Sequence, residues 1–193
     1  MKLTLTVLAL FLLQAVIPAA TLYAQAPRAE DENEVKAQII LNLPLVANWP
    51  EGTLPDDGKV RLCTLSDGKV SHYLKLMAAQ PSYADHIVFV PHIRDQQVRQ
   101  CQVLFFDKQD AARMEALLET IGQAPVLTVG TTRNFARQKG MIGFLNTQKS
   151  IGLFSQKNVK FEINMRQTSA TGITLDPLLL ELAEKIIPEG GTP

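Results

Sequence analysis

Few side chains in this sequence have the types and spacing that catalysis or metal binding requires. His72, His86 and His92 are the only histidines, and no cysteine or carboxylate cluster accompanies them at the spacing of metal ligands. The sequence contains neither a Gly-x-Ser-x-Gly nucleophile motif nor a glycine-rich phosphate loop, and Asp67-Gly68-Lys69 is interpreted as a turn. The sequence therefore predicts no catalytic site, no metal site and no cofactor.

The N-terminal segment has the pattern of a secretory signal. Lys2 precedes an apolar run over residues 3–17, which ends at Pro18 and is followed by small residues up to Ala24 and Ala26. The run of about fifteen residues is shorter than the roughly 20 that span a bilayer, although an uncleaved membrane anchor is the alternative. We expect residues 1–24 to be a signal peptide, cleaved after residue 24 or 26, and the protein to be exported.

Export to an oxidising compartment would allow the two cysteines to form a disulfide. Cys63 lies within VRLCTL and Cys101 opens CQVLFF, so each is expected in or beside a core strand. In an oxidising compartment the two are expected to form a disulfide. Closing a loop of that length would stabilise the fold by about 4 kcal/mol in the chain-entropy model. Two buried free thiols are the alternative, because cysteine also packs as a small hydrophobic residue.

Composition indicates an ordinary globular protein. Hydrophobic residues make up 46% and charged residues 20% of the chain. The 19 basic residues balance the 19 acidic residues, so no net field attracts nucleic acid, and no nucleic-acid partner is predicted.

Apolar patterning over residues 32–187 predicts one α/β domain, followed by a tail at 188–193. Strands are expected at 60–65, 87–91, 102–106 and 126–129, and helices at 32–47, 70–79, 109–122 and 131–138. Alternating strands and helices favour a mainly parallel sheet with helices on both faces. Pro44 is expected to kink or shorten the first helix.

The segment from residue 140 to residue 164 is typical of an antiparallel β-meander that extends this sheet. Its apolar runs at 141–145, 151–154 and 159–163 are separated by NTQKS and SQKN. Phe161 and Ile163 alternate with Glu162 and Asn164, which predicts apolar side chains on a buried face and polar ones in solvent.

Capping residues divide the C-terminal end into two expected helices. Asn164 can begin a short helix through residue 169, and Gly172 can end it. Asp176 can cap a last helix over 178–187, with Pro177 at its first position. LLLELA is apolar nearly all round, so this helix either lies in the core or presents apolar surface to a partner.

Several segments, in this order, resemble the YfiR family of periplasmic proteins: VKAQIILNLPLVANWP, VRLCTL, CQVLFF, PVLTVG…FARQKGMIGF and VKFEINMRQTSATGITLDPLLLELA. The resemblance implies an α/β domain without catalytic activity, pairing of Cys63 with Cys101, and a tendency to form a homodimer. It also implies a regulator that holds an inner-membrane diguanylate cyclase inactive from the periplasmic side. An outer-membrane lipoprotein can sequester such a regulator. Some members carry a second cysteine pair around the strand at 141–145, which this sequence lacks.

The C-terminal region is the predicted partner-binding surface, because it has more apolar positions than one helix face can bury. The candidate residues are Met165, Arg166, Ile173, Leu175, Leu178, Leu179 and Glu181, with the charged pair at the rim. We expect Leu178→Asp or Ile173→Asp to leave a folded protein that no longer binds its partner.

A small-ligand receptor is the alternative function. Its ligand would occupy a pocket between strand ends and crossover loops, and the protein would feed a membrane sensor.

Overall fold

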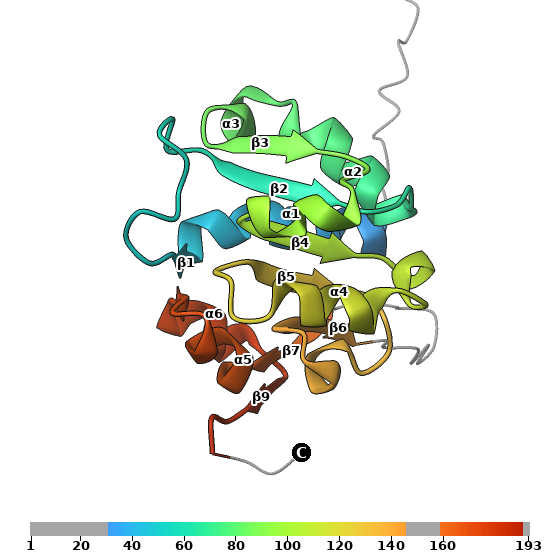
Figure 1. Ribbon diagram of the computed structural model, residues 1–193. Coiled ribbons are helices and arrows are strands. Elements are labelled where there is room, and N and C mark those ends of the chain that lie inside the picture. The colour runs from blue at the N-terminus through green and yellow to red at the C-terminus, as the bar shows by residue number, and fades with distance from the viewer. Residues whose placement is uncertain (1–30, 146–158, 191–193) are drawn as a thin grey trace, which may run out of the picture.

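The computed structural model describes residues 31–145 and 159–190. Within these residues, seven strands form one sheet in the order β3-β2-β4-β5-β6-β7-β9 (Figure 1). They are β2 (Val60–Thr64), β3 (Ile87–Val90), β4 (Val103–Phe106), β5 (Leu127–Gly130), β6 (Ile142–Leu145), β7 (Lys160–Asn164) and β9 (Lys185–Ile187). Strands β2 to β6 run parallel, and β7 is antiparallel to β6. The predicted α/β fold, a mainly parallel sheet with an antiparallel extension, is confirmed.

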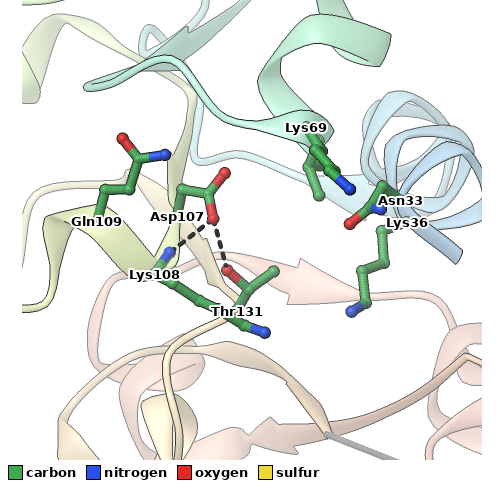
Figure 2. A pocket seen from close by; sticks show the side chains of 8 residues that line it. Asn33, Lys36, Lys69, Asp107, Lys108, Gln109 and Thr131 are labelled. Carbon is green, nitrogen blue, oxygen red and sulfur yellow. Dashed lines mark hydrogen bonds between the residues drawn. The ribbon is translucent and has the colours of Figure 1, made fainter.

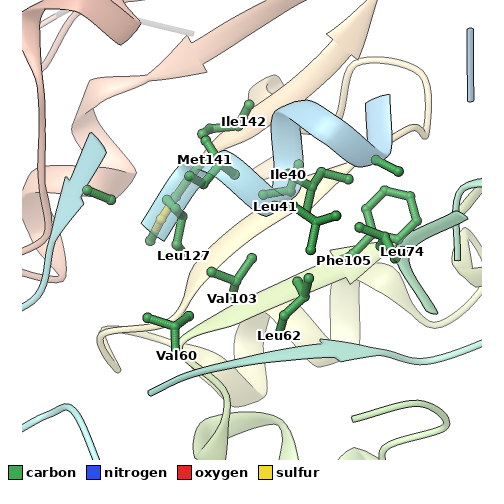
Figure 3. Close-up of a cluster of buried hydrophobic side chains, with 14 of the residues drawn as sticks. Ile40, Leu41, Val60, Leu62, Leu74, Val103, Phe105, Leu127, Met141 and Ile142 are labelled. Atoms are coloured by element: carbon green, nitrogen blue, oxygen red, sulfur yellow. The ribbon is translucent and has the colours of Figure 1, made fainter. Parts of the chain in front are cut away.

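Helices cover both faces of the sheet. The face with α1 (Glu32–Val46) and α2 (Lys69–Ala78) holds one buried cluster, which includes Val103 and Phe105 of β4 (Figure 3). The opposite face, with η1 (Asp95–Gln100) and α4 (Met114–Ile121), buries Leu104 and Phe106 of the same strand. Because successive side chains of a strand point to opposite faces, the unbroken run VLFF serves both clusters.

Local signals explain where α1 and α4 begin or end. Asp31 caps α1 by accepting a hydrogen bond from the backbone N–H of Asn33 at 2.9 Å. Gly122 ends α4 in a conformation with φ of 57°, which glycine adopts without a steric penalty. Pro44 does not shorten α1, which continues to Val46. Its missing N–H removes one hydrogen bond close to the helix end, where the loss weakens the helix little.

Short elements complete the described chain. They are β1 (Ala47–Asn48), α3 (Pro81–Ala84), η2 (Lys108–Asp110), η3 (Phe135–Gln138), α5 (Met165–Ala170), β8 (Thr174–Leu175) and α6 (Pro177–Leu182). β1 pairs with β8 in an antiparallel ladder, which ties the exit of α1 to the C-terminal region.

The prediction of a last helix over 178–187 is wrong at its C-terminal end. α6 ends at Leu182, Ala183 is extended, and β9 pairs in parallel with β7, with Ile186 opposite Ile163. The sheet offers this segment a ladder of backbone hydrogen bonds, and that tertiary pairing overrides the helical pattern of the sequence.

The expectation that Glu162 and Asn164 face solvent is also wrong. β7 lies between β6 and β9, and Glu162 is only 1% exposed. Its carboxylate accepts a hydrogen bond from Arg137 Nε at 3.4 Å, and Asn164 Nδ2 donates to the Ala136 carbonyl at 2.6 Å. Both faces of β7 are therefore covered, and its polar side chains are satisfied by protein partners. The middle run of the expected meander, at 151–154, falls outside the described residues.

Candidate functional site

A cavity of about 220 Å³ lies at the carboxyl edge of the parallel strands. The chain passes from β2 to β3 on one side and then crosses to β4 on the other, so the strand order reverses between β2 and β4. In open α/β sheets, ligands bind outside the carboxyl ends of the strands at such a reversal, because the loops that follow diverge there. The lining includes Asn33, Lys36, Lys69, Asp107, Lys108 and Thr131.

Asp107 is the fixed centre of this cavity. It directly follows β4, and its Oδ1 accepts hydrogen bonds from the Lys108 backbone N–H at 2.6 Å and from Thr131 Oγ1 at 3.3 Å (Figure 2). Gly68, which precedes α2, gives the carboxylate its space, since a Cβ there would lie 1.8 Å from Asp107 Oδ2. A carboxylate at a helix N-terminus interacts favourably with the helix dipole.

Three lysines surround the same space. Figure 2 shows Lys36, Lys69 and Lys108 among the side chains that line the cavity, with the Lys108 side chain running past Thr131. Lys36 is only 4% exposed: its Nζ lies 2.5 Å from Glu32 Oε1 and 5.7 Å from the centre of the Phe144 ring. The other two ammonium groups are carried by exposed residues.

Cys63 and Cys101 form the predicted disulfide, with their Cα atoms 6.0 Å apart. Cys63 lies on β2, and Cys101 lies two residues before the neighbouring strand β4. Both sulfurs are buried on the face that α4 covers. A disulfide fits an oxidising compartment such as the periplasm.

The predicted partner-binding residues separate into a buried and an exposed set. Ile173, Leu175 and Leu179 belong to the core beneath α1 and do not face solvent. Leu178 is 58% exposed on α6, and Leu182, which the sequence analysis did not include, is 66% exposed four residues later on the same helix face.

The remaining predicted residues lie near this face in the chain. Arg166 and Glu181 are exposed, and Met165 is half-buried. Arg166 Nε donates to the Glu189 carbonyl at 3.2 Å. The C-terminal apolar surface is therefore defined by Leu178 and Leu182 of α6.

Comparison with known proteins identifies the family. The sequence model of the YfiR/HmsC-like family matches residues 33–184, which is most of the chain. The chain belongs to the YfiR/HmsC-like family. Proteins of this family regulate signalling from the periplasm. No curated protein is similar enough in sequence to count as a relative.

Solved structures show that the YfiR/HmsC-like chain shares its fold with more distant proteins. A conserved domain protein from Vibrio cholerae O1 biovar El Tor is 14% identical, with a TM-score of 0.51, and the match covers 80% of this chain and 60% of that one. The ABC domain in complex with L-Trp from Streptococcus pneumonia is 12% identical, with a TM-score of 0.50, and the match covers 81% and 60% of the two chains. The protein thus spans about 60% of the length of these structures, and the likeness concerns the fold alone.

The histidines of this YfiR/HmsC-like protein do not assemble a metal site. His92 Nε2 lies 3.2 Å from Asp67 Oδ1 at the surface, while His86 precedes the other end of β3. Over residues 31–145 and 159–190, no group of three or more His, Cys, Asp or Glu side chains could hold a metal ion. Among the same residues, no helix combines the length and the apolar character that a membrane span needs.

For the alternative function, a pocket was expected between strand ends and crossover loops, but none of its residues was named, although a signal for them exists. Asp107 and Thr131 each follow an apolar strand directly, and the carboxyl ends of neighbouring parallel strands meet at one edge. Lys69 was assigned to a turn, but Gly68 is the N-cap of α2 and Lys69 begins that helix.

Proposed function

We propose that this protein is a periplasmic regulator that binds the extracytoplasmic domain of an inner-membrane signalling enzyme, a diguanylate cyclase, and holds it inactive. Membership of the YfiR/HmsC-like family over residues 33–184 carries the proposal. The Cys63–Cys101 disulfide supports a periplasmic location. The predicted signal peptide, residues 1–24, delivers the chain there and is cleaved after residue 24 or 26. The protein acts by binding and has no enzymatic activity.

The C-terminal apolar surface is the contact that we propose for the cyclase. Repression requires tighter binding to the inactive state, and about 5.5 kcal/mol moves a two-state equilibrium from 1:99 to 99:1. Burying the exposed parts of Leu178 and Leu182, which are 58% and 66% exposed, contributes about 2–4 kcal/mol. Leu178 and Leu182 therefore supply part of the preference that repression requires, and we assign Arg166 and Glu181 to the charged rim of the contact.

Two further partners follow from the family resemblance. An outer-membrane lipoprotein sequesters the regulator and thereby releases the cyclase, and a second copy of the chain forms a homodimer. Light scattering of the exported protein, alone and mixed with the cyclase domain, measures whether the dimer persists in the complex.

Binding of Leu178→Asp to the purified periplasmic domain of the host's diguanylate cyclase tests the surface. We expect a loss of affinity of at least tenfold, because a carboxylate would be buried against an apolar contact. Leu76→Asp is the matched control, since Leu76 is 55% exposed on α2, far from α6 in Figure 1. Equal affinities of the two variants would show that the cyclase binds elsewhere.

Cellular cyclic di-GMP tests the function itself. Deleting the gene should raise the cyclic di-GMP concentration, and only a copy that retains residues 1–24 should restore it. An unchanged concentration over several growth conditions would contradict the repressor function.

A small-ligand receptor that feeds a membrane sensor is the second candidate, and the cavity at the strand-order reversal favours it. One structure of similar fold is described as a complex with L-Trp. A metabolite that raises the melting temperature, with no shift on adding the cyclase domain, would favour the receptor over the repressor.

A further inference from the structure

The lining of the cavity between the carboxyl ends of β2 and β4 holds more ammonium groups than carboxylates. Lys36, Lys69 and Lys108 contribute three ammonium groups to its lining, against the single carboxylate of Asp107. That carboxylate is already engaged, because its Oδ1 accepts two hydrogen bonds. Its other oxygen lies against Gly68 at the start of α2. The lining itself therefore carries three ammonium groups and one carboxylate, while the carboxylates of Glu32 and Asp31, just outside the lining, interact with Lys36 and Lys69.

The buried Lys36 ammonium group is held in a fixed position by the folded protein. Burying an ammonium group costs several kcal/mol unless hydrogen bonds and a counter-charge compensate. Lys36 is held in place by Glu32 one helical turn away and by the face of the Phe144 ring. Its position on α1 is thus fixed before any ligand arrives, and two of the three ammonium donors remain for further contacts.

The neighbouring polar groups are equally constrained. Thr131 is 3% exposed and its hydroxyl is bonded to Asp107. Asn33 lies in the first turn of α1, whose N-cap is Asp31. Among the described residues that line the cavity, Lys69 and Lys108 are the exposed cations, and they can contact a molecule inside it (Figure 2).

We propose that this cavity binds a small molecule through an oxyanion group, a phosphate or a carboxylate. Lys36, which is paired with Glu32, offers its remaining ammonium donors from within, and the exposed Lys69 and Lys108 contact the anion from the first residues of α2 and η2, beside the strand-order reversal. The volume of about 220 Å³ lies below the roughly 300–1,000 Å³ of pockets for drug-sized ligands, so the ligand is compact. The inference names the ligand class for the receptor candidate, and it does not depend on a protein partner.

Isothermal titration calorimetry of the exported protein, at low ionic strength in a buffer without phosphate or carboxylate, tests the site. Inorganic phosphate and succinate are the two probes. We expect saturable 1:1 binding of at least one of them, weakened at least tenfold in Lys69→Gln/Lys108→Gln. Lys75→Gln/Lys185→Gln is the matched control: both residues are exposed, lie outside the cavity lining, and give the same change of net charge.

Amide chemical shifts locate the binding. The resonances of Lys69, Lys108 and Thr131 should move most on titration with the bound probe. Binding of phosphate alone assigns the ligand group as phosphate, and binding of succinate alone assigns it as carboxylate. The proposal is overturned if neither probe binds at millimolar concentration, if both double variants weaken equally, or if the largest shifts occur away from the cavity. Such a failure would leave the binding of the cyclase domain untouched.

Discussion

At the scale of single residues, the Cys63–Cys101 disulfide joins β2 to the segment just before its neighbour β4. Cross-linking residues separated by 38 positions restricts the unfolded chain, and removal of a native disulfide typically costs about 2–5 kcal/mol. We expect Cys63→Ala/Cys101→Ala to lower the free energy of unfolding by that amount in urea denaturation. Wild-type protein unfolded with reductant is the control, and it should lose a similar amount. A double variant as stable as the oxidised protein would refute a stabilising role.

Two apolar residues, both expected on the partner-binding surface, differ in burial. Ile173 is 2% exposed in the core, whereas Leu178 is 58% exposed. Ile173→Asp should therefore unfold the protein or cost at least about 3 kcal/mol, because it buries an unpaired charge. Leu178→Asp should change the free energy of unfolding by no more than about 0.5 kcal/mol.

This difference revises the expectation that either substitution leaves a folded protein. Thermal unfolding followed by circular dichroism measures both variants. A cooperative, wild-type-like transition for Ile173→Asp would mean that this side chain does not belong to the core.

At the scale of elements, the N-cap of α1 gives a prediction about pH. The backbone N–H of Asn33 is the largest cause that lowers the pKa of Asp31, and the Asn33 and Tyr73 side chains and Lys69 add to it. A carboxyl group with a lowered pKa in the folded state stabilises the protein above its unfolded pKa. That stability is lost as the pH falls through the folded pKa.

Asp31→Ala should therefore cost about 1 kcal/mol at pH 7, within the usual 0.5–2 kcal/mol for a lost N-cap. The difference from wild type should shrink as the pH falls below the unfolded pKa of an aspartate, near 3.9. Asp31→Asn keeps a capping oxygen and should stay close to wild type at pH 7. Urea denaturation at several pH values measures all three proteins, and a constant difference across the range would contradict the assignment.

At the scale of the whole molecule, one sheet carries both hydrophobic clusters. Because β4 contributes side chains to both, neither cluster can lose its packing without disturbing the other. We expect a single cooperative unfolding transition in urea. Fluorescence of Trp49, the one tryptophan, and far-UV circular dichroism should give the same midpoint. Separated midpoints would show that the two faces unfold independently.

The sequence by itself determined what depends on neighbouring residues. The strand runs, the caps at Asn164 and Asp176, and the apolar face of α4 were readable because period and capping act within a few positions. Family membership was readable too, since it rests on the order of short segments.

Only the tertiary structure decided what depends on strand order. In the folded protein β9 pairs with β7 and Glu162 is buried. Ile173 lies in the core, whereas Leu178 is exposed to solvent. The same holds for the cationic cavity, whose residues come from α1, α2 and the loops after β4 and β5. These residues lie together because the chain crosses from β3 back to β4. Patterns of neighbouring residues do not specify such a long-range connection.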